Sequence, residues 1–230
     1  MEIYKRSQVD WALWQAYTAR VIGFPADMPP GFGTRLKRLL ELDRRSISYP
    51  GSETPYARYA FMDDAPTGRG VDLPYTFANV WCLALAIDML DAGFNPADII
   101  FLLRHIRGDL EYELNDILRA LPTQDGTVPL EARPDAPTIK KPPHNFADGR
   151  VYLVIRKREM KELFTVLKGK LIDHPLFEAP LFYHGAEDLM SDIKQFGYAK
   201  RWGFVLEIAC IAALLTDLLP RAPMIRRGRS

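Results

Sequence analysis

Residues 75–107, YTFANVWCLALAIDMLDAGFNPADIIFLLRHIR, constrain the fold more than any other part of the chain. Large apolar side chains recur there every three or four positions, as they do on the buried face of a helix. Gly93 stands where a first helix can end in the left-handed conformation, and Asn95 and Pro96 provide an N-cap and a first helical residue for a second. The stretch therefore predicts two helices whose apolar faces other elements must cover. The residues assigned to those faces are Val80, Leu83, Ala84, Ile87, Leu90, Ile99, Leu102, Leu103 and Ile106.

Two more helices are predicted ahead of this pair. Ser7 as a cap and Asp10 in the first turn indicate a helix that runs to about residue 20. The sequence GFPADMPPGFG at 23–33 interrupts it, because proline and glycine do not continue a helix. Residues 34–43, TRLKRLLELD, form the next helix, with leucines facing inward and cations facing outward. The outward cations are Arg35, Lys37 and Arg38.

Residues 46–74 change to short extended pieces. Aromatic residues, Tyr59 and Phe61 among them, alternate with small or polar residues, and APTGRG at 65–70 is a turn or loop sequence. The simplest interpretation of this pattern is a β-hairpin. Arg69 lies at its tip and Arg58 at its base.

The second half predicts a separate module. A helix over residues 109–121 ends the first domain (1–121), and the proline-rich residues 122–149 form a linker. Residues 150–220 form an α+β module for dimerisation or effector binding, and residues 221–230 form a basic tail. The module has a strand at 151–155, VYLVI, whose exposed edge could pair between subunits. Helices follow at 158–167, 186–196 and 199–219, and the last is buried either in the core or in a dimer interface.

The order of elements in the first half is that of a winged helix-turn-helix: helix, glycine-containing break, basic helix, hairpin, two antiparallel helices. Within it, Tyr75 and the run DMLDAGFNPADI at 88–99 resemble the end of the wing and the helix pair of MerR-like regulators. The resemblance covers residues 75–107 only. It implies a dimer whose two basic helices enter successive major grooves, with the wings on the flanking backbone. By element position, the implied DNA contacts are Thr34, Arg35, Lys37, Arg38, Arg58 and Arg69.

The chain also departs from the MerR pattern. The break before the basic helix is long and rich in proline, and the long dimerising coiled coil of the family is replaced by the linker and the second module. The overall expectation is thus a mainly α protein with small β elements, an N-terminal winged helix-turn-helix and a C-terminal α+β module. The DNA contacts are carried over by element position and not by an exact motif.

Composition narrows the choice of function. The net charge is +1, so attraction to nucleic acid must come from local patches. The longest apolar run, 202–219, contains Glu207 and Asp217, which favours a packed helix over a membrane span and predicts a cytoplasmic, nucleoid-associated protein. Cys82 and Cys210 lie in apolar runs and are expected to be buried free thiols.

Signals for catalysis are weak. His174, His184, Glu187 and Asp188 lie close in sequence, but they form no HExxH motif and no paired-cysteine set. GFGTRLK at 31–37 lacks the preceding strand and the lysine spacing of a phosphate-binding loop. We therefore expect no enzyme activity, no cofactor and no metal. The prediction is a homodimeric transcription regulator that binds double-stranded DNA. A protein-interaction adaptor that uses the same fold without DNA remains the alternative.

Overall fold

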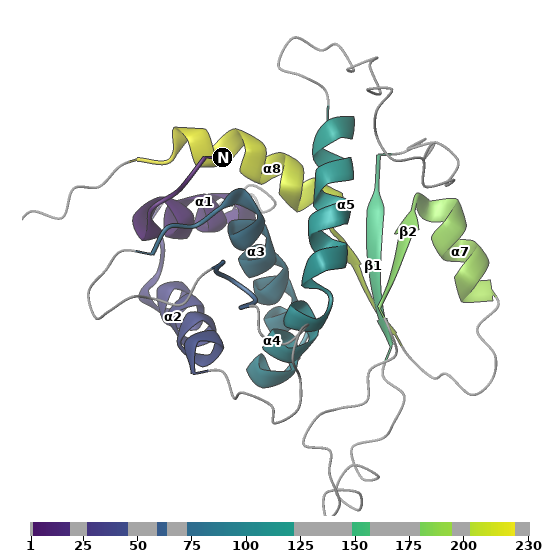
Figure 1. Cartoon of the computed structure of the whole chain (residues 1–230), viewed down its shortest axis with the longest axis horizontal. Helices are drawn as coiled ribbons and strands as arrows, with labels where there is room; N and C mark the ends of the chain where they lie inside the picture. Colours follow the sequence, from purple (N-terminus) through teal and green to yellow (C-terminus); the bar gives the residue numbers. More distant parts are fainter. Residues whose placement is uncertain are drawn as a thin grey trace, which may run out of the picture. The chain divides into compact units, whose positions relative to one another are not determined.

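A computed structural model describes residues 2–18, 27–45, 59–63, 73–121, 149–156, 180–194 and 203–223 (Figure 1). These residues form helices and one small antiparallel sheet, which confirms the expected mainly α class with small β elements. The chain divides into two compact units, Met1–Tyr112 with Ile211–Ser230, and Glu113–Cys210. The expected division placed residues 150–220 together, whereas the structure groups those from Ile211 onward with the first unit.

The first unit is helical. It contains α1 (Arg6–Thr18), α2 (Pro30–Arg44), α3 (Phe77–Asp91), α4 (Pro96–His105), the start of α5 (Arg107–Ala120) and most of α8 (Ala209–Arg221). Helix α3 is apolar on almost every side and supplies the centre of the core, with Trp81, Leu83 and Ile87 fully buried. A helix of this kind is stable only when neighbours cover all of its faces. Helices α1, α2 and α4 all pack against α3.

The junction between α3 and α4 forms as the sequence predicts. Gly93 adopts a φ of 88°, and the N–H of Phe94 donates to the carbonyl of Met89 (3.0 Å), so the helix ends in a left-handed C-cap. The Asn95 side chain then accepts a hydrogen bond from the N–H of Ala97 (3.1 Å), and Pro96 takes the first helical position. Local sequence signals therefore fix the angle at which α4 leaves α3.

The second unit contains a three-stranded antiparallel sheet in the order β2-β1-β3. The strands are β1 (Val151–Arg156), β2 (Leu181–His184) and β3 (Gly203–Glu207), and α7 (Ala186–Lys194) follows β2. The expectation that the VYLVI strand has an exposed edge was wrong. It is the central strand β1, and both of its edges already bond to β2 and β3.

The expectation of a single helix over residues 199–219 was also wrong. Residues 203–207 form β3, and α8 begins only at Ala209. The apolar run is compatible with a helix or with a strand. Residues 203–207 form a strand because they pair with β1, from Tyr152 opposite Glu207 to Arg156 opposite Gly203. The Glu207 carboxylate then accepts hydrogen bonds from the N–H groups of Ala209 (2.9 Å) and Cys210 (3.0 Å), which starts the helix.

Several other expectations change or fall outside the described residues. Of the predicted hairpin, the structure describes residues 59–63 and 73–74, and these form no strand. The hairpin tip, residues 122–148, the helix at 158–167 and residues 224–230 lie outside the described part. Cys82 is buried as expected, but Cys210 is exposed. Among the described helices, none is both long and apolar enough to cross a membrane.

Candidate nucleic-acid interface

Helix α2 separates an apolar inner face from a polar outer one. Phe32, Leu36, Leu39 and Leu40 are buried, and Asp43 at the C-terminal end of the same face is fully buried. Helical periodicity places the opposite stripe in solvent. We call this outer stripe the α2 stripe; it consists of Thr34, Lys37, Arg38, Glu41 and Arg45.

Three of the predicted contact residues lie on the α2 stripe. Arg38 is exposed, and no carboxylate pairs with it within the described residues. Lys37 is exposed and lies 3.7 Å from the Glu41 carboxylate, measured from Nζ to Oε1. The Thr34 hydroxyl donates to the carbonyl of Pro30 (2.9 Å) on the preceding turn. The stripe therefore presents long cationic side chains on a helix that the core holds fixed.

Arg35 is placed differently from the other three. It lies on the flank of α2, and its guanidinium forms an ion pair with Asp91 at the end of α3. Its side chain is 39 % exposed and that of Asp91 is 50 % exposed, so solvent weakens the pair. A phosphate would have to compete with Asp91 for Arg35. Arg58 and Arg69, the predicted wing contacts, lie outside the described residues.

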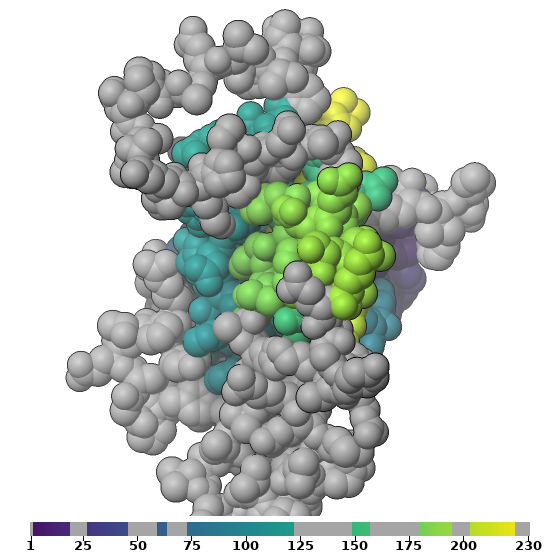
Figure 2. Space-filling model, turned by 90° about the vertical axis from the view of Figure 1, so that its right-hand side faces the viewer, coloured from purple at the N-terminus to yellow at the C-terminus, as the bar shows by residue number. Residues whose placement is uncertain are grey.

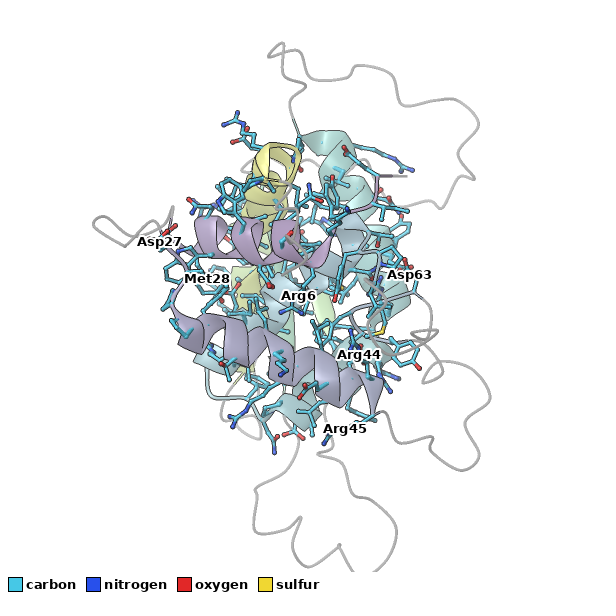
Figure 3. All side chains as sticks on the ribbon, turned by 90° about the vertical axis from the view of Figure 1, so that its left-hand side faces the viewer. Arg6, Asp27, Met28, Arg44, Arg45 and Asp63 are labelled. Atoms are coloured by element: carbon cyan, nitrogen blue, oxygen red, sulfur yellow. The ribbon has the colours of Figure 1, made fainter. Side chains whose placement is uncertain are left out.

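Two cations that the sequence interpretation missed extend the surface. Arg44 and Arg45 are exposed at the C-terminal end of α2, and Figure 3 shows them on the same face as Arg6 of α1. Burial raises the pKa of Tyr75, against the lowering effect of the Arg6 and Arg44 charges. Extending the predicted helix beyond residue 43 would have placed Arg45 on the α2 stripe.

A buried carboxylate fixes the end of α2. The Asp43 side chain accepts hydrogen bonds from the N–H groups of Ala60 (3.1 Å) and Phe61 (3.0 Å), and from Nε of Arg104 on α4 (2.8 Å). These bonds explain why residues 60 and 61 join no strand, since their N–H groups donate to Asp43 instead. Residues 60 and 61 are thereby held against the end of α2 and against α4.

Arg107 completes this buried network from the first turn of α5. Its guanidinium donates to the carbonyl of Ala60, to Oδ1 of Asn79 (2.7 Å) and to Oε1 of Glu111 (2.7 Å). Asp63 lies at 3.3 Å from the same group. Tyr59, Met62, Asp63, Arg107 and Glu111 line a pocket of about 290 Å³. Because each guanidinium nitrogen of Arg107 already has a protein acceptor, the arrangement serves to hold residues 59–63 in place.

Among the described residues, the histidine and acids considered for catalysis form no cluster that could hold a metal ion. His184 lies beside Glu113 in the second unit, with Nε2 at 3.3 Å from Oε2 and both side chains buried. Glu187 and Asp188 are exposed on α7. Nowhere in the described ranges do three or more histidine, cysteine or acidic side chains come close enough together to hold a metal ion. His174 lies outside these ranges.

Comparison of this chain with models of protein families, with curated proteins and with solved structures found no match. The geometry and charge of α2 are therefore the features of the molecule that bear on its function.

Proposed function

We propose that the protein is a sequence-specific regulator of transcription that binds double-stranded DNA as a homodimer, through a winged helix-turn-helix similar to that of MerR-like proteins. The observation that supports this proposal is the α2 stripe. It carries Thr34, Lys37, Arg38 and Arg45 on the side of α2 opposite the buried face. A recognition helix needs this division, because one side must stay packed while the other enters the major groove.

The residue types suit DNA. Arg38 and Arg45 can each donate two parallel hydrogen bonds to guanine, and Thr34 can contact a phosphate or a thymine methyl group. Lys37 and Arg44 can neutralise phosphates and set the register of the helix on the duplex. Arg35 would join them only by leaving Asp91, so its contribution is smaller than the sequence alone predicts.

Two residues support a second candidate function. Glu41 lies within the α2 stripe and Leu42 beside it is 40 % exposed. A carboxylate repels phosphates, and an exposed leucine suits an apolar partner. An adaptor that docks a protein on α2 would use both. Such binding would depend on Leu42 and respond weakly to salt, whereas duplex binding would weaken steeply as salt rises.

The decisive experiment is a gel-shift selection from random duplexes, followed by titration of the selected duplex at several salt concentrations. The variant Arg38→Ala with Arg45→Ala should lose at least tenfold in affinity for the selected duplex and should discriminate less between duplexes that differ in sequence. The control is Arg119→Ala, which removes an exposed arginine from α5 in the second unit. Helical circular dichroism should be unchanged in both.

Two results would contradict the proposal. One is the absence of any enriched duplex, together with no salt dependence of binding. The other is equal loss of affinity in the α2 variant and in Arg119→Ala. Loss of a protein partner on Leu42→Ala, with no duplex binding by the unaltered chain, would favour the adaptor.

A further inference from the structure

Helix α7 covers only part of one face of the sheet in the second unit. Leu181 and Val205 both pair with Val154 of the central strand, so all three side chains point to the same face. Arg156 lies on that face too, and its ion pair with Asp192 places α7 there. Val154 is buried, but Leu181 and Val205 on the outer strands remain 37 % and 40 % exposed.

Helix α7 adds two exposed apolar side chains of its own. Met190 is 48 % exposed and Ile193 is 40 % exposed, although Leu189 on the inner side is buried. Figure 2 shows the outer surface of α7 and β2 in green on one face of the molecule. Exposed large apolar residues that gather on one element are typical of a surface that meets a partner.

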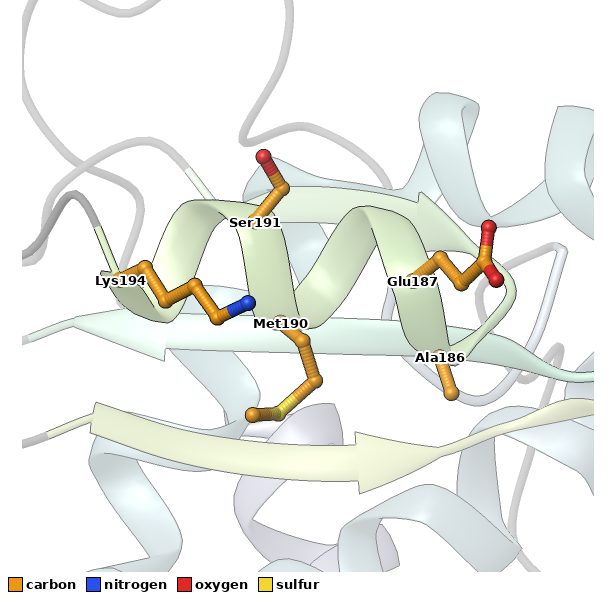
Figure 4. A pocket seen from close by; sticks show the side chains of 5 residues that line it. All are labelled: Ala186, Glu187, Met190, Ser191 and Lys194. Atoms are coloured by element: carbon orange, nitrogen blue, oxygen red, sulfur yellow. The ribbon is translucent and has the colours of Figure 1, made fainter.

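The charges on α7 are arranged in a self-complementary way. Glu187, Met190, Ser191 and Lys194 follow the helical spacing of three and four residues and form one exposed row, which we call the α7 stripe. Figure 4 shows Glu187 and Lys194 towards the two ends of the helix, with Met190 and Ser191 between them. Seven residues of helix separate the two charges by about 10 Å, which is too far for an ion pair within one chain.

We infer that the α7 stripe is the centre of a two-fold interface with a second copy of this chain, in which two α7 helices pack antiparallel. The midpoint between Glu187 and Lys194 falls between Met190 and Ser191. A two-fold axis through this point brings Glu187 against the partner subunit's Lys194, and Lys194 against the partner subunit's Glu187. Met190 lies at the centre, where a second copy removes it from water. The interface is isologous, so each favourable contact occurs twice.

An isolated helix also gains from acids near its N-terminus and a lysine near its C-terminus, through the helix dipole. That effect explains Glu187, Asp188 and Lys194, but it gives no reason for an exposed methionine between them. It also makes a different prediction for variants. Exchanging Glu187 and Lys194 opposes the dipole at both ends, whereas it restores both ion pairs of a two-fold interface.

This inference rests on the dimeric regulator proposed above, so its test measures association without DNA. Sedimentation equilibrium of the full chain, over a range of micromolar concentrations, should show a monomer–dimer equilibrium. Each of the single variants Glu187→Lys and Lys194→Glu creates two pairs of like charges across the dimer interface. Each should therefore weaken dimerisation about tenfold. The double variant Glu187→Lys with Lys194→Glu should restore it to within a few-fold of the unaltered chain. Asp188→Lys, an equal charge change off the stripe, is the matched control.

Restoration in the double variant, with little effect of Asp188→Lys, supports the α7 interface. The inference is overturned if the unaltered chain stays monomeric over the whole range. It is also overturned if the single variants dimerise normally, or if the double variant is the weakest of all. Circular dichroism melts of each variant show whether the fold is retained. A dimer that binds no duplex would refute the proposed DNA function and leave this interface standing.

Discussion

Asp43 shows how one side chain links the candidate DNA surface to the rest of the molecule. It is fully buried, and it holds two backbone N–H groups and the Arg104 guanidinium at once. A buried carboxylate is tolerated only with such partners. In the sequence, Asp43 looks like one more polar residue at the end of a charged helix. Its role was not predictable, because its partners lie 17 to 61 positions further along the chain.

Replacing Asp43 should be costly. Asp43→Ala leaves Arg104 buried without its counter-charge and leaves two N–H groups without acceptors, so the free energy of unfolding should fall by about 3–5 kcal/mol. Glu41→Ala, two positions away on the outer face, should change it by less than about 1 kcal/mol. Urea unfolding followed by circular dichroism measures both. Similar small losses in the two variants would show that the buried pair stabilises the fold little.

At the scale of elements, the sequence correctly predicted the helices that neighbouring residues specify. It failed for elements whose structure is determined by residues far away in the sequence. The α3–α4 pair was correct because apolar spacing, Gly93, Asn95 and Pro96 all lie within the pair itself. Strand β3 was missed because residues 203–207 become a strand by pairing with β1, about fifty positions earlier. The α2 stripe was largely predictable from its own periodicity. The pairing of Arg35 with Asp91 was not, since 56 positions separate them.

The C-cap of α3 gives a test of this local control. Gly93 has a φ of 88°, and a Cβ added there would meet no atom within 4 Å, so only the backbone conformation opposes a larger residue. Gly93→Ala should therefore lower the free energy of unfolding by about 1 kcal/mol. Gly93→Asn should cost less, because asparagine tolerates the left-handed region. Thermal melts compare the two variants, and an alanine variant as stable as the unaltered chain would contradict this account of the turn.

At the scale of the whole molecule, the first unit is built from two separate parts of the chain. Most of α8 belongs with the N-terminal helices, and the side chain of Gln8 on α1 donates to the carbonyl of Ala222 (3.5 Å). Helix α8 buries Ile211, Leu215 and Leu219. The sequence alone suggested that residues 1–121 form a domain by themselves, and periodicity cannot show which unit a terminal helix joins.

A fragment of residues 1–121 should therefore be much less stable than the full chain. Burial of three large aliphatic side chains contributes about 5 kcal/mol or more, which is comparable to the whole stability of many domains. The fragment should show reduced helical signal and rapid proteolysis, and an added peptide of residues 203–223 should restore part of its structure. A fragment that melts cooperatively at the temperature of the full chain would contradict the role of α8.

The place of α8 in the chain also sets when the first unit can be finished in a cell. Synthesis proceeds from the N-terminus at about 5–20 residues per second, and N-terminal parts usually fold first. Here α1 to α4 leave the ribosome early, but Ile211, Leu215 and Leu219 follow only after the entire second unit. The apolar surface that α8 covers stays open during that interval. Completion of the apolar core of the first unit is thus a late event in the synthesis of the chain.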